Sequence, residues 1–171
     1  MSRKTDQATL RRLPGPYAIE TLEARYLRQS FKPHAHDEYL LGVIDGGVHA
    51  VWCRGEMNLV PAGMVVTMRP GDVHHGGSGG EQGWRQRMLY IPEAGMRAWL
   101  CDITDRDAAG TLDFDAAFHA RANLAQRFTN LHKILHEPSL ALVRDSALDA
   151  LLGALLEELA GRDAAPDRQP D

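Results

Sequence analysis

Three histidines have the residue type and spacing that a metal or small-molecule site needs. His34 and His36 stand two residues apart, and His74 follows the turn-forming run Pro70-Gly71-Asp72. Side chains two apart on a strand point to the same face, so His34 and His36 are expected to place two imidazoles side by side. The turn can bring His74 on a neighbouring strand to face them. Three neutral imidazoles suit zinc, nickel, iron or copper, and they can equally bind a small molecule through directional hydrogen bonds.

A second group of candidate residues lies on one predicted strand, over residues 84–91. Alternate residues of a strand share a face, so this run separates into two sets. One set contains Trp84, Gln86, Met88 and Tyr90, and the other contains Arg85, Arg87 and Leu89. One of the two sets is expected to line the interior of the domain.

The surrounding pattern indicates that strands position these residues. Glycine and proline turn formers interrupt residues 17–90 at short intervals. Between the turns, runs rich in strand formers cover residues 38–44, 48–53, 64–68 and 84–91. Many short strands at this spacing predict an antiparallel sandwich or barrel.

Helices are expected to follow the strands. A short helix is predicted over residues 92–101, and a further strand around residues 112–118. Asn123 is typical of a helix N-cap. The apolar residues after it recur at steps of four and three, as one helical face requires, at Leu124, Phe128, Leu131 and Leu135.

A second helix is predicted after Pro138, ending at Gly161. Its leucines between Leu148 and Leu159 cover a wide arc, so one part can cover the barrel while another meets a partner helix. His132 and His136 lie four residues apart on the preceding helix, and we expect them on its surface because no third ligand accompanies them.

Composition excludes several classes of function. The chain has 171 residues and a formal net charge of −4, so it has no global attraction for nucleic-acid phosphates. Cys53 and Cys101 are its two cysteines and have no C-x-x-C spacing, which favours a reducing compartment. No apolar run approaches the roughly 20 residues that a membrane span needs. We therefore expect a soluble cytoplasmic protein with no membrane partner.

Two short motifs resemble those of a known family. His34-Ala35-His36 and Gly71-Asp72-Val73-His74 resemble the half-motifs of the cupin barrel. Over roughly residues 20–160 the chain is similar to the effector-binding and dimerisation domain of AraC-type transcription regulators. The similarity rests on the order and spacing of Phe31-Lys32-Pro33-His34, Tyr39, Gly47, Pro61-Ala62-Gly63, Arg69 to His75, Gly83-Trp84, Leu89-Tyr90 and Asn123-Leu124.

The resemblance implies an α+β fold, in which two antiparallel helices follow an antiparallel cupin-like β-barrel (jelly roll). The parts expected are a flexible N-terminal arm over residues 1–15, the barrel over 16–118, a helical dimerisation hairpin over 119–161, and a linker or frayed tail over 162–171.

The resemblance also suggests roles for individual residues. It places the Trp84, Gln86 and Met88 face toward the effector, although Trp84 and Met88 would also suit a core. Lys32 lies where the family can place an effector-contacting cation, and its alternative is a solvated loop lysine.

For a divalent transition metal, the candidate ligands are His34, His36 and His74. Metal-binding cupins usually carry a glutamate four or five residues after the second histidine, and those positions here are Leu40 and Leu41.

Two functions follow from these observations. The first is a non-catalytic sensor that binds a small-molecule effector, forms a homodimer, and contacts DNA only through a C-terminal domain not included in this chain. The alternative is a small metal-dependent cupin enzyme, such as a dioxygenase or isomerase. The absent glutamate and the leucine-rich helices favour the sensor.

Overall fold

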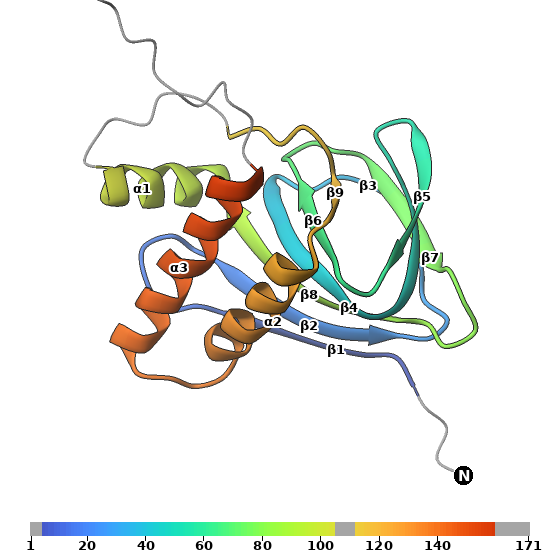
Figure 1. Ribbon diagram of the computed structural model, residues 1–171, viewed down its shortest axis with the longest axis horizontal. Coiled ribbons are helices and arrows are strands. Elements are labelled where there is room, and N and C mark those ends of the chain that lie inside the picture. Colours follow the sequence, from blue (N-terminus) through green and yellow to red (C-terminus); the bar gives the residue numbers. More distant parts are fainter. Residues whose placement is uncertain (1–4, 105–111, 160–171) are drawn as a thin grey trace, which may run out of the picture.

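The computed structural model describes residues 5–104 and 112–159. Strands form a barrel on one side of the molecule, and helices gather on the other (Figure 1). In chain order the elements are β1 (Gln7–Arg12), β2 (Glu20–Tyr26), β3 (Ser30–His34), β4 (Glu38–Cys53), β5 (Glu56–Pro61), β6 (Met64–Met68), β7 (His74–Ser78), β8 (Trp84–Pro92), α1 (Glu93–Thr104), β9 (Phe118–Ala120), α2 (Ala122–His136) and α3 (Ala141–Leu159).

The long strand β4 joins the two sheets of the barrel. Its first half pairs antiparallel with β8 and β6, in a sheet ordered β1-β2-β8-β4-β6-β9. Its second half pairs with β5 and β7, and β7 also pairs with β3. The pairing with β8 shifts register between Ile44 and Gly46, a bulge of the kind that bends a strand. Residues 38–44 and 48–53, expected as separate strands, are therefore one bent strand.

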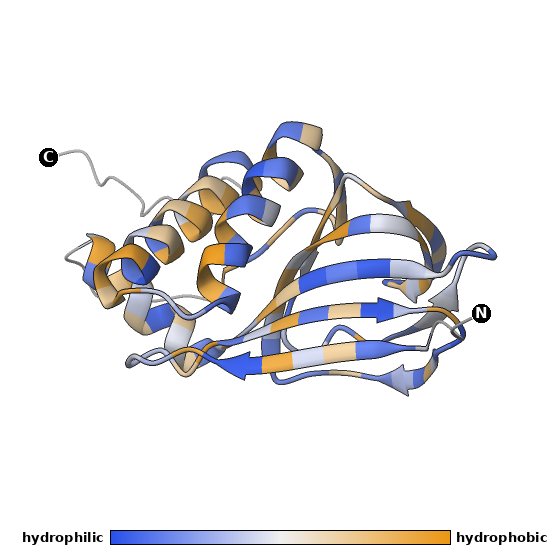
Figure 2. Cartoon of the chain, turned by 90° about the horizontal axis from the view of Figure 1, so that it is seen from below, coloured by the Kyte–Doolittle hydropathy of each residue, from blue (hydrophilic) through white to orange (hydrophobic). Residues whose placement is uncertain are grey.

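Side chains alternate between the two faces of the strands, and the two faces contribute to two separate hydrophobic cores. The strands contain both hydrophobic and hydrophilic residues (Figure 2). Leu40, Ile44 and Met88 belong to a core inside the barrel, whereas Leu41 and Leu89 face the opposite side and join a second core with the helices. This period of two is what a sheet with apolar layers on both faces requires.

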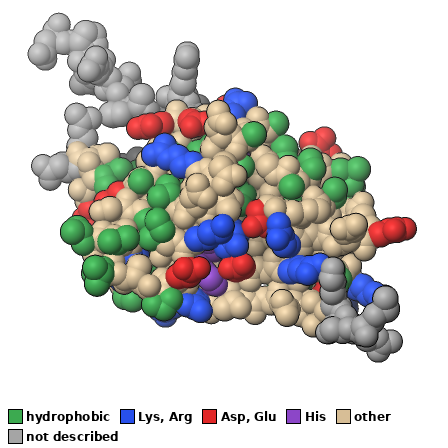
Figure 3. Space-filling model, turned by 60° about the horizontal axis from the view of Figure 1, so that its bottom comes forward, with side chains coloured by type: hydrophobic (Ala, Val, Ile, Leu, Met, Phe, Trp, Pro, Cys, Tyr) green, Lys and Arg blue, Asp and Glu red, His purple; other side chains and the backbone are tan. Residues whose placement is uncertain are grey.

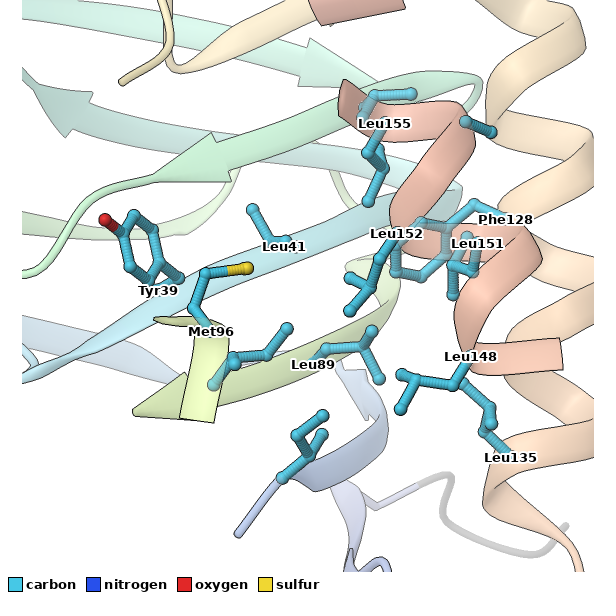
Figure 4. Packing of buried hydrophobic residues seen from close by; sticks show 14 of the residues in the cluster. Tyr39, Leu41, Leu89, Met96, Phe128, Leu135, Leu148, Leu151, Leu152 and Leu155 are labelled. Carbon is cyan, nitrogen blue, oxygen red and sulfur yellow. The ribbon is translucent and has the colours of Figure 1, made fainter. Parts of the chain in front are cut away.

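The second core holds the helices on the sheet. Leu41 of β4 and Leu89 of β8 meet Met96 of α1, Phe128 of α2 and the inward leucines of α3 (Figure 4). Phe128 and Leu151 are fully buried. The helices therefore cover one face of the sheet, and the opposite face lines the barrel. None of the described helices is long and apolar enough to cross a membrane.

The α+β fold predicted from the sequence is confirmed, with a cupin-like antiparallel barrel followed by two helices. Two local expectations differ from the structure. Strand β9 lies at Phe118–Ala120, after most of the run 112–118 expected as a strand. Helix α2 begins at Ala122, and Arg121 occupies its N-cap position without a side-chain capping hydrogen bond, so Asn123 is inside the first turn and is not the N-cap.

The N-terminal region also differs from its expectation. Residues 7–12 form β1, which pairs with β2, whereas residues 1–15 were expected to be an arm without regular structure. All six residues of β1 are exposed. Backbone hydrogen bonding at the sheet edge thus forms this strand, although its sequence has no apolar period that would predict it. Residues 1–4, the predicted helix end at Gly161 and the tail over 162–171 lie outside the described residues.

Candidate functional site

Three imidazoles meet at one end of the barrel. His34 ends β3, and its Cα pairs in register with that of His74, the first residue of β7. Their ring centroids are 4.3 Å apart, and the His36 ring lies 5.0 Å from His34 and 5.4 Å from His74. One ring nitrogen from each of the three lies within 4.8 Å of the others. The sequence-predicted cluster is therefore assembled in the fold.

Backbone carbonyls orient two of these rings. His34 Nδ1 lies 2.7 Å from the carbonyl oxygen of Lys32, and His74 Nδ1 lies 2.9 Å from that of Asp72. A carbonyl only accepts, so each Nδ1 carries the hydrogen and donates it. When such a ring is neutral, its Nε2 keeps the lone pair. This is the arrangement that metal-ligating histidines use, and it serves equally to accept a hydrogen bond from a ligand.

The turn before His74 is held by a buried carboxylate. Asp72 accepts hydrogen bonds from the Arg54 guanidinium at 3.0 and 3.1 Å and from the Arg69 backbone N–H at 3.0 Å. Burial opposes ionisation of Asp72, but these donors outweigh it and lower its pKa. Gly71 supplies the positive φ of 81° that the turn needs, and its N–H donates to the His36 carbonyl at 2.8 Å. The turn thereby ties His36 to His74.

The histidine cluster opens into a cavity inside the barrel. Its volume is about 130 Å³. A cavity of this order accepts a small ligand built around one ring. Beside the imidazoles, Gln86 and Tyr90 offer polar groups, and the apolar wall includes Leu40, Ile44, Val51, Val66, Met68 and Met88.

The described part of the cavity wall contains no Lys, Arg, Asp or Glu. Burial lowers the pKa of His36, and the neighbouring His74 and His34 rings lower it further. Burial likewise lowers the pKa of His74, and it raises the pKa of Tyr90 to about 12. Because no Lys, Arg, Asp or Glu is among the described residues of the wall, a ligand in this cavity would meet hydrogen-bonding groups, apolar side chains and imidazole rings.

A comparison of the sequence with protein families identifies the domain. Residues 16–168 match the AraC-like ligand binding domain. The chain belongs to this family. The match spans all nine strands except β1 and extends over the three described helices, so the AraC-like ligand binding domain includes both the barrel and the helices.

Several solved cupins are similar to part of this AraC-like domain. A Cupin 2 conserved barrel domain protein from Salinispora arenicola is 20% identical, with a TM-score of 0.45, and the match covers 56% of this chain and 84% of that one. An RmlC-like cupin from Methanocaldococcus jannaschii is 11% identical, with a TM-score of 0.45 and coverage of 56% and 90%. Oxalate decarboxylase from Bacillus subtilis is 17% identical, with a TM-score of 0.46 and coverage of 52% and 26%. No curated protein sequence matches the chain.

The structure places the remaining predicted site residues in two groups. Gln86 and Met88 line the cavity. Trp84 is on the same face of β8 but lies behind the wall, where it is buried and its indole Nε1–H donates to Gln86 Oε1 at 2.8 Å. Lys32 is exposed and lies outside the cavity wall, because the register shift between Phe31 and His34 turns those two side chains inward instead.

Among the cavity residues of the AraC-like domain that the sequence did not predict is a further histidine. His49 of β4 lines the cavity and stacks flat on Trp84, with ring centroids 4.5 Å apart and 2° between the planes. It shares strand parity with Val51 and Cys53, which are buried inside the barrel. That parity was the available signal, but it does not by itself say which face of a strand is interior.

His132 and His136 are not surface residues, contrary to expectation. Both are buried between α2 and the sheet. His132 Nε2–H donates to the Met88 carbonyl at 3.1 Å, and Thr21 Oγ1 lies 2.8 Å from His136 Nδ1. Hydrogen bonding to the sheet thus places two polar side chains on the buried face of the helix.

Proposed function

We propose that this chain is the small-molecule-sensing and dimerisation domain of a transcription regulator, and that its effector binds in the barrel cavity. The observation that carries this proposal is the wall of the cavity, which combines convergent imidazoles with an apolar lining. Small-molecule sites use this mixture, since apolar surface supplies affinity and a few polar groups supply orientation. Family membership favours a sensor over a small metal-dependent cupin enzyme.

The three imidazoles are proposed as the principal polar contacts. Because Nδ1 of His34 and of His74 is occupied by a carbonyl, the effector meets an Nε2 acceptor on each ring. An effector with a hydroxyl or amide N–H satisfies these acceptors directly. Met88 and the neighbouring aliphatic side chains contact its apolar part.

A divalent transition metal is a second proposed occupant of the same cluster. The donor set fits, because two imidazoles are already held in the tautomer that presents Nε2 and the pKa shifts of His36 and His74 favour neutral rings. His34, His36 and His74 would be the ligands, and the metal would supply a Lewis acid to which an effector oxygen or nitrogen binds. Leu40, one of the two positions where metal-binding cupins usually carry glutamate, offers no further donor.

Homodimerisation and DNA binding complete the proposal. The helical hairpin of α2 and α3 is the proposed dimer contact, and DNA is contacted through a C-terminal domain outside this chain.

The charged side chains of the domain are mixed in sign. On the face shown in Figure 3, Lys and Arg side chains lie among Asp and Glu side chains. On the sheet, Arg87 forms ion pairs with Glu23 and Asp45. Together with the net charge of −4, this gives the domain little attraction for phosphate.

The effector proposal is tested by thermal stability of the purified chain across a small-metabolite library, with and without chelator. A ligand selective for the folded state raises the melting temperature by mass action. His34→Ala and His74→Ala are expected to abolish the shift of any hit. Lys32→Ala is the matched control, because it changes an exposed side chain beside His34 and should leave the shift intact. A hit with unchanged affinity for both histidine variants would place the pocket elsewhere.

Chelator distinguishes the two modes of binding. If a metal mediates binding, the shift disappears with chelator and returns on adding zinc or nickel. If the imidazoles contact the effector directly, chelator has no effect.

A further inference from the structure

His49 has a buried polar atom with no partner. Its Nε2 is shielded from solvent and makes no hydrogen bond within the described part of the chain. The ring cannot easily turn away, because one face lies flat on the Trp84 indole. The His49 side chain lines the cavity. An unsatisfied buried polar atom costs free energy, so its position next to a cavity points to a ligand group that satisfies it when the cavity is filled.

Gln86 presents a hydrogen-bond donor at the same place. Its Oε1 accepts the indole N–H of Trp84, which fixes the orientation of the amide. The NH₂ end therefore remains as the donor, with no partner shown among the described residues, and Gln86 lines the cavity. Trp84 is accordingly a positioning residue, which aligns the His49 ring by stacking and the Gln86 amide by hydrogen bonding.

The pairing of strands places this group away from the histidine cluster. On β4, Cys53 pairs with His74, while His49 lies four residues along the strand, with Val51 between them on the same face. Four residues of strand correspond to roughly 13 Å. Strand β8 has the same order of polar, apolar and polar residues along the cavity. Tyr90 lies beside the His36 ring, Met88 is in the middle, and Gln86 is at the other end. The cavity thus has two polar ends and an apolar middle.

The second polar end carries no charge. Arg85 and Arg87 belong to the opposite face of β8, where both pair with Asp45. Burial lowers the pKa of His49 to about 4, so this imidazole is neutral at physiological pH. A carboxylate placed here would lose its hydration without gaining a cation.

We propose that His49 and Gln86 form a second ligand-binding subsite, and that the effector is an elongated, uncharged small molecule with a hydroxyl or carbonyl oxygen at this end. Such an oxygen accepts from the Gln86 amide, and a hydroxyl also satisfies His49 Nε2. The inference rests on the proposed function, because it concerns the same cavity.

The test uses three probes of matched shape, measured by calorimetry in the presence of chelator. The first is para-benzenedimethanol, which has a hydroxyl at each end. The second is para-ethylbenzyl alcohol, in which a methyl group replaces one hydroxyl, and the third is the anionic para-(hydroxymethyl)benzoate. We expect the diol to bind about tenfold tighter than the ethyl analogue, as the loss of one or two hydrogen bonds implies, and tighter than the benzoate.

His49→Phe keeps an aromatic ring over Trp84 and removes both ring nitrogens. We expect this variant to bind the diol and the ethyl analogue with similar affinity. His34→Ala is the matched control, since it should weaken both probes while the preference for the diol remains. Equal binding of the two probes by the wild type, or an undiminished preference in His49→Phe, would overturn the subsite.

Failure of the subsite and failure of the proposed function give different results. If neither alcohol binds at millimolar concentration while library compounds still stabilise the chain in a manner that depends on His34, the ligand class is overturned and the sensor remains. If no library compound stabilises the chain, both proposals are overturned.

Discussion

The histidines of this domain show how one side chain acquires different properties from its surroundings. His34 and His74 are each oriented by a backbone carbonyl, and their rings lie next to one another at the end of the barrel. His49 is held by stacking on an indole, and one of its nitrogens is left without a protein partner among the described residues. His132 links a helix to the backbone of a cavity strand. Residue type identifies none of these roles without the contacts.

Buried His132 is expected to make stability depend on pH. Its Nδ1 has no hydrogen-bond partner within the described residues, and burial lowers its pKa from 6.5 to about 4, with Arg87, His136 and Glu23 as the charged or titrating groups nearby. Between these two values the unfolded chain binds a proton that the folded chain does not. The stabilisation is therefore complete above about pH 6.5 and is lost as the pH falls toward 4.

His132→Phe tests this effect, because phenylalanine retains a ring in the stack with Phe128 and His136 but does not titrate. We expect the wild type to lose up to about 3 kcal/mol more unfolding free energy than the variant between pH 7 and pH 4. Urea unfolding at a series of pH values measures the difference. If the unfolding free energies of the two proteins depend on pH in the same way, His132 has the same pKa in the folded and unfolded chains.

At the scale of elements, two glycines allow β4 to approach the turn that leads into β8. Gly47 has a φ of +67°, and a Cβ there would lie 2.0 Å from the Gly83 carbonyl oxygen. Gly83 has a φ of +70°, and its Cβ would lie 2.0 Å from the Tyr26 carbonyl oxygen. At this point Gly47 pairs with Trp84. The pairing of β4 with β8 that starts here places Trp84 and Gln86 at the His49 end of the cavity.

Gly47→Ala is expected to destabilise the barrel more than Gly55→Ala. Gly55 also has a positive φ, +91°, but nothing lies within 4 Å of its added Cβ, so alanine there costs about 1–2 kcal/mol of backbone strain. At Gly47 a clash with backbone adds to that strain, for a total of about 3 kcal/mol or more. Denaturant midpoints of the two variants measure the difference. Equal losses would mean that the strands separate easily at this point.

At the scale of the whole molecule, the leucines of α3 pack against other elements of the same chain. Leu151, Leu152 and Leu155 are fully or almost fully buried against the sheet and α2 (Figure 4). The wide arc was expected to leave a part for a partner helix. Within the described residues, contacts with other elements of the same chain bury most of this arc, and Leu156 is half-buried. A charged residue at Leu152 would therefore unfold the domain and could not test dimerisation.

The exposed apolar residues at the start of α3 give a sharper test of the proposed homodimer. Leu140 and Leu142 are each 78% exposed, and Val143 is 46% exposed. We expect the wild type to sediment as a dimer at micromolar concentration, and Leu142→Glu to weaken association at least about tenfold, because a buried unpaired charge is costly at an interface. Arg97→Glu, at an exposed position of α1 outside the proposed contact, is the matched control.

Sedimentation velocity together with the thermal midpoint separates association from folding. Leu142→Glu should unfold at nearly the same temperature as the wild type when both are monomeric. A wild type that remains monomeric at high micromolar concentration would refute the dimer, and an unchanged dimer in Leu142→Glu would place the contact elsewhere.

The local pattern of the sequence determined much of the barrel and the centre of the site. Turn formers and strand formers delimit β6 and nearly all of β8, because strand residues alternate between faces and glycine or proline stops the pairing. The same period placed His34 beside His36, and the Pro70-Gly71-Asp72 turn brought His74 to them. These relationships are local, or cross a single turn, and can be read without knowing how the elements pack.

Tertiary structure alone decided which faces are interior and which partners each side chain meets. His49 reaches the cavity because β4 bends from one sheet into the other, and Lys32 stays outside because β3 shifts register. His132 is buried because β8 offers it a carbonyl from a distant part of the chain. Strand β1 forms through backbone pairing that leaves no side-chain pattern. A sequence period shows which residues share a face, but the direction of that face depends on contacts between segments far apart in the chain.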